Sequence, residues 1–104
     1  MYLCGMDQVD VFKALSNKTR LLILQWLKDP VLHFPEQEHG LSDVGVCVGQ
    51  IQKKANLTQS TVSEYLSLLQ RTGLVESTRV GQWTYYKRNE KALEAVKAII
   101  NNEL

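Results

Sequence analysis

Hydrophobic residues recur at helical spacing near the start of the chain. Residues 7–16 place an apolar side chain at every third position, and residues 17–28 carry a broader apolar stripe. Both patterns predict helices, and the breadth of the second stripe predicts a helix that is buried on most sides. The side chains expected to point inward are Val9, Phe12 and Leu15 in the first helix and Leu21, Leu24 and Leu27 in the second.

A proline ends this helical region. Asp29 precedes Pro30, and a residue before proline avoids helical backbone angles, so the second helix is expected to end here. Residues 31–44, which contain Pro35 and Gly40, predict a loop. A loop of this length is uncommon in a small domain and is usually functional or mobile.

Two helices joined by a short turn follow. Residues 47–55 and 59–72 have helical spacing, with a turn at 56–57. Thr58 is a good N-cap for the second of these helices, and Gly73 predicts its left-handed end. The residues expected to point inward are Val48, Ile51 and Ala55 in the first helix and Val62, Leu66 and Leu69 in the second.

The spacing then changes to that of a hairpin. Residues 75–80 and 83–87 are rich in β-branched and aromatic side chains, and the pair 81–82, Gly-Gln, supplies a tight turn between them. Residues 89–104 return to helical spacing. The inward residues of this last helix are expected to be Leu93, Val96, Ile99 and Ile100. The pattern therefore predicts a mainly α-helical fold of about five helices with one β-hairpin.

Length and composition narrow the class of protein. The chain has 104 residues, which suits a single domain spanning 1–104, and 44% of them are hydrophobic. No apolar run approaches the roughly 18 residues of a membrane-spanning helix, and the N-terminus lacks the pattern of a secretory signal, so we expect a cytoplasmic protein without a membrane partner. No phosphate-binding loop, paired-carboxylate pattern or Ser-His-Asp order indicates an enzyme, and no cofactor is expected.

The net charge of +1 conceals an uneven distribution. Residues 29–43 contain four carboxylates and no Lys or Arg, whereas residues 51–91 contain seven Lys and Arg against three Glu. A basic half can bind a polyanion even when the total charge is near zero. Charge alone leaves open that both clusters are ordinary solvated surfaces.

The helix predicted at 59–72 exposes a polar N-terminal half. A DNA major groove admits one α-helix, and short polar side chains near a helix N-terminus can reach phosphates or base edges. Gln59 suits adenine, Glu64 suits the amino group of cytosine, and Tyr65 suits a phosphate or a thymine methyl group. The alternative is a helix that is polar because it faces water. The candidate contacts are Gln59, Ser60, Thr61, Ser63, Glu64 and Tyr65.

The predicted hairpin adds positive charge beside this helix. Arg79 lies on one strand, Lys87 and Arg88 lie on the other, and Gln82 lies in the turn. A basic hairpin can contact DNA phosphates, and each neutralised phosphate contributes salt-dependent affinity. Strand aromatics usually pack on a core, which we expect for Tyr85. For Trp83 and Tyr86 the sequence does not decide between a place in the core and a place on the surface.

Four segments resemble the ArsR/SmtB family of bacterial winged-helix transcriptional repressors. Residues 12–24 resemble the opening pattern ALxxxxRLxIL, and residues 47–51 resemble the third helix. Residues 58–66 resemble the recognition helix, SxSxVSxHL, and residues 73–75 with 81–86 resemble the wing. The resemblance implies a winged helix-turn-helix fold and a homodimer joined by its first and last helices. It also implies binding to double-stranded DNA at an imperfect palindromic operator, relieved by an inducer that the sequence does not name.

The chain departs from the family pattern at three places. Tyr65 stands where the family usually has His, and Gln82 stands where a wing-tip Arg is common, which weakens that phosphate contact. Residues 31–44 separate the second and third helices more than in compact members. We expect no metal site, because the family's Cys-x-Cys pattern retains only Cys47, with Gly49 at its second position. A thiol switch formed by Cys4 and Cys47 stays an alternative.

A second function class also stays open. A winged helix can dock a protein partner without binding specific DNA. Such a docking surface would more often expose apolar anchors on the helix at 59–72.

Overall fold

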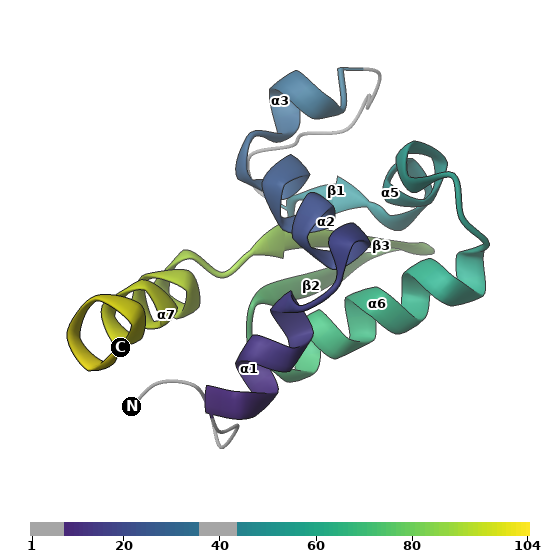
Figure 1. Cartoon of the computed structure of the whole chain (residues 1–104). Helices are drawn as coiled ribbons and strands as arrows, with labels where there is room; N and C mark the ends of the chain where they lie inside the picture. Colours follow the sequence, from purple (N-terminus) through teal and green to yellow (C-terminus); the bar gives the residue numbers. More distant parts are fainter. Residues whose placement is uncertain (1–7, 36–43) are drawn as a thin grey trace.

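The computed structural model describes residues 8–35 and 44–104, and it is mainly helical (Figure 1). Three strands form an antiparallel sheet in the order β1-β3-β2. The fold class expected from the sequence is confirmed. The elements of the described part are α1 (Gln8–Leu15), α2 (Lys18–Lys28), α3 (Pro30–His33), β1 (Val46–Cys47), α5 (Val48–Ala55), α6 (Gln59–Arg71), β2 (Val75–Val80), β3 (Trp83–Arg88) and α7 (Glu90–Glu103).

Short polar side chains determine where three of these helices begin. The Asn17 side chain accepts a hydrogen bond from the backbone N–H of Arg20 at 3.0 Å, at the start of α2. Thr58 accepts from the N–H of Thr61 at 3.3 Å at the start of α6, as the sequence predicts. Each bond satisfies one of the N–H groups that a first helical turn leaves without a partner. The side chain of Asn89 does the same for α7.

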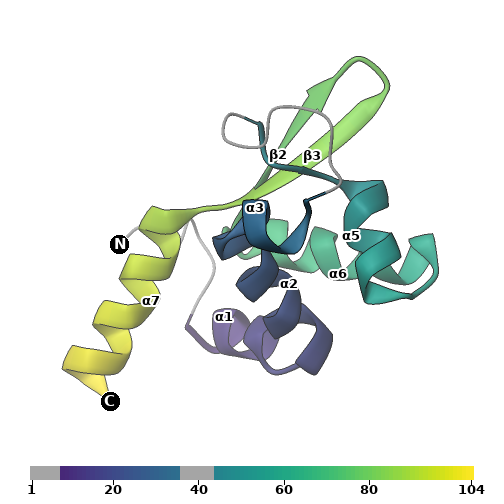
Figure 2. The ribbon, with the colours of Figure 1, turned by 90° about the horizontal axis from the view of Figure 1, so that it is seen from above.

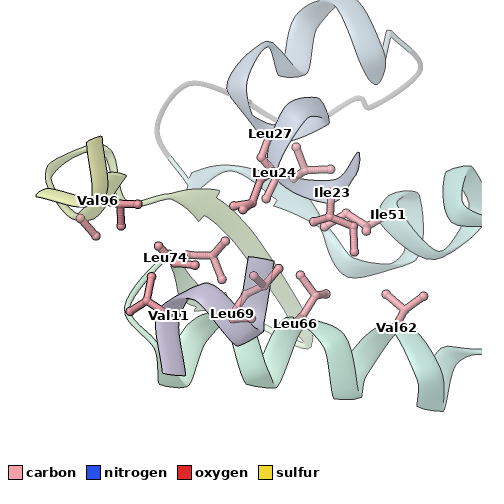
Figure 3. Close-up of a cluster of buried hydrophobic side chains, with 14 of the residues drawn as sticks. Val11, Ile23, Leu24, Leu27, Ile51, Val62, Leu66, Leu69, Leu74 and Val96 are labelled. Atoms are coloured by element: carbon pink, nitrogen blue, oxygen red, sulfur yellow. The ribbon is translucent and has the colours of Figure 1, made fainter. Parts of the chain in front are cut away.

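The core lies where α6 meets the helices that precede it (Figure 3). Val62, Leu66 and Leu69 of α6 are fully buried, which confirms the predicted inner face of this helix. Ile23 of α2 and Ile51 of α5 are also fully buried and belong to the same cluster. Because one face of α6 is committed to this core, its opposite face is held in a fixed direction.

Three residues expected to point inward lie on the surface. Val9 is 59% exposed, Leu21 is 42% exposed and Ile100 is 51% exposed. Helix geometry explains why Val9 is exposed. Successive helical residues are rotated by about 100°, so Val9 lies roughly 170° around α1 from the buried side that Val11 and Ala14 define. These two residues are the buried ones in α1. Apolar spacing therefore predicted the helices correctly but misplaced the buried side of α1.

The predicted loop at 31–44 begins as a helix. Pro30 is the first residue of α3, where a proline's missing N–H costs nothing, so the proline that ends α2 also begins the next helix. Phe34 follows and is only 3% exposed. Its ring meets Trp26 edge-on, with the ring centroids 6.4 Å apart. The rest of the predicted loop, residues 36–43, lies outside the described residues.

A two-residue strand stands where the sequence predicted the start of a helix. β1 pairs with β3, with Val46 opposite Tyr86 and Cys47 opposite Tyr85, and helix α5 begins one residue later. Gly45 precedes the strand with φ of +99° and lies against the backbone of Tyr86. Two residues are too few to show a strand periodicity, and the partner strand lies far along the chain. The sequence pattern therefore could not predict β1. No helix in the described part is long and apolar enough to cross a membrane.

Candidate nucleic-acid interface

α5 and α6 form a helix-turn-helix unit. α5 ends at Ala55 and is capped by Asn56, whose backbone is left-handed with φ of 56°. The N–H of Asn56 donates to the carbonyl of Gln52 at 2.9 Å. Asn tolerates this conformation better than most residues. The chain then reaches Thr58, which begins α6. Buried Ile51 and Val62 belong to one core cluster, so the two helices have a fixed relative orientation.

The N-terminal half of α6 presents a polar surface. Gln59, Ser60, Ser63 and Glu64 are exposed, and no large apolar side chain lies among them. Thr61 is half-buried, and its hydroxyl oxygen accepts a hydrogen bond from the Thr58 hydroxyl at 2.9 Å. Four of the six predicted helix contacts therefore point to solvent together, while Thr61 also serves the start of the helix.

Tyr65 is held differently from the other predicted contacts. Its ring is half-buried and lies beneath the guanidinium of Arg20, whose Cζ is 5.3 Å from the ring centroid. The same guanidinium donates from Nε to the carbonyl of Ala14 at 2.7 Å and from Nη2 to the carbonyl of Lys13 at 3.2 Å. Arg20 therefore joins the C-terminal end of α1 to the recognition-helix candidate α6. Arg20 is the arginine of the ALxxxxRLxIL pattern, but its contacts could not be predicted, because a lone arginine at a helix start gives no sign of its partners.

The β2–β3 hairpin projects beyond the helical body (Figure 2). Gly81 has φ of 63°, which suits the tight turn that the sequence predicted. Arg79 is exposed, and its Nε donates to the carbonyl of Gly81 at 3.1 Å. Gln82 lies exposed in the turn, and Lys87 lies exposed opposite Glu76. Three predicted wing contacts are therefore on the surface, with Arg79 and Gln82 at the tip and Lys87 nearer the root.

One side-chain bond connects the wing to α6. The Nε2 of Gln70, in the last turns of α6, donates to the hydroxyl of Ser77 on β2 at 2.9 Å. Tyr85 of β3 is 3% exposed, so it packs in the interior as predicted. Tyr86 is half-buried, and its burial raises the pKa of the phenol above the ordinary value of 10.0. These contacts hold the wing root in place while the tip stays exposed.

Comparison with known proteins assigns this arrangement to a family. A sequence profile described as "Bacterial regulatory protein, arsR family" matches residues 41–77. The chain is 48% identical over 100 residues to the uncharacterized HTH-type transcriptional regulator YbzH of Bacillus subtilis, covering 95% of this chain and all 100% of that one. It is 32% identical over 82 residues to the putative arsenical resistance operon repressor ArsR2 of Halobacterium salinarum, covering 79% and 59%. The chain belongs to the ArsR family.

A solved structure agrees with this assignment. Mb0332 from Mycobacterium bovis is described as a homodimeric winged helix-turn-helix DNA-binding domain and a possible ArsR-family transcriptional regulator. It aligns with a TM-score of 0.64 at 27% identity and covers 95% of this chain and 90% of that one. The ArsR-family chain is thus a DNA-binding transcriptional regulator with a winged helix-turn-helix fold, and its relatives are regulators rather than enzymes.

The structure describes only one of the two cysteines of the predicted thiol switch. Cys47 is buried in β1 and is 8% exposed, and its predicted thiol partner Cys4 lies outside the described residues. Gly49 is exposed on α5. Within residues 8–35 and 44–104, no three His, Cys, Asp or Glu side chains gather as metal ligands. His33 lies in α3, away from α6 in the view of Figure 1.

Proposed function

We propose that the chain is a homodimeric repressor that inserts α6 into the major groove and lays its wing on the adjacent backbone. The observation that carries the proposal is the polar, exposed N-terminal half of α6 beside a projecting hairpin. A surface for docking a protein would place apolar anchors there. In the described part, no large apolar side chain is exposed on α6 itself, although Leu57 in the turn before it is 36% exposed.

The predicted contacts divide into two roles. Gln59, Ser63 and Glu64 reach base edges, because their exposed side chains lie along the outward face of α6. Ser60 and Thr61, in the first turn, lie where helix N–H groups favour a phosphate. Tyr65 contributes its remaining exposed edge beside Arg20. The wing contacts, which we assign to the sugar-phosphate backbone, are Arg79, Gln82 and Lys87.

Helices α1 and α7 form the proposed dimer interface. A hydrogen bond of 3.1 Å from Gln8 Nε2 to Glu103 Oε1 connects the start of α1 to the end of α7. Val9 on α1 is 59% exposed, Ile100 on α7 is 51% exposed, and Leu104, which follows α7, is 83% exposed. An open groove of about 950 Å³ also runs along α7 past Ala95, Ala98 and Ile99. Exposed apolar side chains on this helix pair suit contact with a second copy of the same pair, and Mb0332 is described as homodimeric.

A two-fold dimer determines the form of the operator. Two recognition helices would meet successive major grooves, so the operator is an imperfect palindrome with half-sites about one helical turn apart. Repression follows when the bound dimer blocks the polymerase, and the ArsR2 relative is named a repressor. An inducer, whose chemistry stays unassigned, would release the dimer by favouring a geometry with the wrong helix spacing. Such coupling is typically about 1–3 kcal/mol.

Selection of bound fragments from a random duplex pool tests the proposal. We expect an imperfect palindrome, and we expect Ser63→Ala to change the preferred base at particular positions by about 1–3 kcal/mol. Arg79→Ala should weaken binding to all sequences and flatten the dependence of affinity on salt, because one phosphate contact is lost. Equal effects of both variants on every sequence would remove the assignment of α6 to base readout.

A further inference from the structure

The tip of the wing carries two apolar side chains as a cross-strand pair. Val80 is 49% exposed and Trp83 is 48% exposed, and they lie opposite each other next to the turn. Directly opposite residues of an antiparallel pair point to the same side of the ribbon. The indole and the valine therefore form one apolar surface at the end of the hairpin, beyond the helical body (Figure 2).

The next pair of residues points to the other side. Arg79 lies opposite Thr84, one residue back from Val80 and Trp83, and side chains alternate sides along a strand. The 3.1 Å bond from Arg79 Nε to the carbonyl of Gly81 keeps the guanidinium beside the turn. The wing tip is therefore two-sided, with a cation on one side and an apolar pair on the other.

Packing within the chain does not account for the apolar pair. Tyr85 points to the same side of the ribbon as Trp83, two residues further from the tip, and it is 3% exposed. On this side of the hairpin Tyr85, in the middle of β3, is buried, whereas the pair at the tip is open to solvent. An indole left half in water at the end of a projecting ribbon is typical of a binding surface, since tryptophan contributes large contact area with little loss of side-chain entropy.

We propose that Trp83 and Val80 pack against the deoxyribose wall of the DNA minor groove while Arg79 faces the phosphates of the opposite strand. This inference rests on the proposed function. The minor groove is only about 6 Å wide, so only the hairpin turn enters it, and the side chains beside the turn meet a wall on each side. Each wall presents apolar sugar C–H groups below charged phosphates, and the two sides of this wing tip offer the matching chemistry. Apolar side chains are a common device of minor-groove binding.

The partner is DNA rather than protein because of what surrounds the pair. Arg79 and Gln82 share the tip with Val80 and Trp83, and the wing root is bonded to the recognition helix through Gln70 and Ser77. A ligand that spans both elements must offer polar groups to α6. At the wing tip it must offer both an anionic group and an apolar surface. Duplex DNA does so, because grooves, sugars and phosphates alternate along it.

Intrinsic fluorescence tests the contact directly. The chain has two tryptophans, so Trp26→Phe leaves Trp83 as the sole indole. The probe is a mixed-sequence duplex of about 30 base pairs, long enough for two half-sites one helical turn apart. We expect the duplex to change Trp83 emission and to reduce its quenching by acrylamide about twofold or more, because a packed indole excludes the quencher.

Affinity measurements then separate the apolar contact from the charged one. We expect Trp83→Ala to weaken duplex binding about tenfold, with an unchanged salt slope, because no phosphate contact is lost. Trp83→Phe should recover most of this affinity. Val31→Ala is the matched control, since Val31 is an apolar residue that is 68% exposed on α3 rather than on the hairpin, and its variant should bind as the parent does.

The fluorescence and affinity measurements distinguish failure of the wing-tip contact from failure of the repressor proposal. Duplex binding at full affinity by Trp83→Ala, without any change in Trp83 emission in the Trp26→Phe chain, overturns the wing-tip contact and leaves the repressor proposal standing. A change of Trp83 emission with protein concentration in the absence of DNA also overturns the wing-tip contact with DNA. In that case Val80 and Trp83 would pack against another copy of the chain. If no duplex binds at any salt concentration, both proposals fail together.

Discussion

Two glycines on either side of β1 have opposite roles at the level of single residues. Gly45 has φ of +99°, and a Cβ at this position would lie 2.2 Å from the carbonyl oxygen of Tyr86. Gly49 lies on α5, where a Cβ would meet nothing within 4 Å. The first glycine is therefore required by β1 pairing, whereas the second only adds flexibility to a helix.

We predict that Gly45→Ala lowers the free energy of unfolding by about 2–4 kcal/mol, because both the strained backbone and the clash with β3 must be relieved. Gly49→Ala should raise it by about 0.5 kcal/mol, since alanine is the better helix former. Urea unfolding of the two variants and the parent measures both changes. Equal stability of Gly45→Ala and the parent would show that β1 does not hold its place on β3.

At the level of elements, Arg20 connects helices that are not neighbours in sequence. It accounts for two hydrogen bonds to the end of α1 and one ring contact with α6. Positive charge at a helix C-terminus is favourable, and a stacked arginine adds to this. The contact with Tyr65 means that the position of the recognition helix depends partly on α1.

We predict that Arg20→Met lowers the free energy of unfolding by about 1–3 kcal/mol, because the carbonyls at the end of α1 lose a charged donor. Arg20→Lys should recover only part of this loss, since an ammonium cannot reach two carbonyls and stack on a ring as a planar guanidinium does. Lys18→Met, in the first turn of the same helix, is the control and should stay within about 0.5 kcal/mol of the parent. A full recovery by lysine would show that charge alone matters.

The difference between predicted and observed elements has a common cause. The inner face of α6, the hairpin turn at Gly81 and the cap at Thr58 depend on neighbouring residues, so local spacing was sufficient to predict them. β1 depends on a partner strand far along the chain, and the exposure of Val9 depends on which helices cover α1. No local pattern contains that information.

The same distinction applies to the candidate site. The exposed polar surface of α6 and the projecting wing follow from alternation and turn residues, and both could be predicted. The contact between Arg20 and Tyr65 and the bond between Gln70 and Ser77 could not, because each pairs a surface residue with one several positions or elements away. These contacts add to the core packing that orients α6 and the wing, whereas the sequence pattern indicates only that the two elements exist.

At the level of the whole molecule, α7 follows directly on β3 and lies at one side of the helical body (Figure 1). Its residues Ala92, Val96 and Ile99 are buried and belong to the core cluster. The backbone N–H of Asn89, at the start of α7, donates to the carbonyl of Leu74 at 3.0 Å, beside the root of the wing. The proposed dimer helix and the proposed DNA-binding wing therefore begin at the same place. A change in the dimer interface would reach the wing root directly, which is the coupling that an inducible regulator needs.

The dimer interface gives the last prediction. Ile100→Glu places a charge on the exposed apolar side of α7, and burying that charge against a second copy would cost several kcal/mol. We expect sedimentation to show a dimer for the parent and a folded monomer for the variant. We also expect operator affinity to fall by about a hundredfold or more, because one half-site cannot supply the contacts of two. The control is Val31→Glu, because Val31 is also an exposed apolar residue, 68% exposed on α3. This variant should change neither the oligomeric state nor the operator affinity. A dimer that survives Ile100→Glu with unchanged affinity would place the interface on another surface.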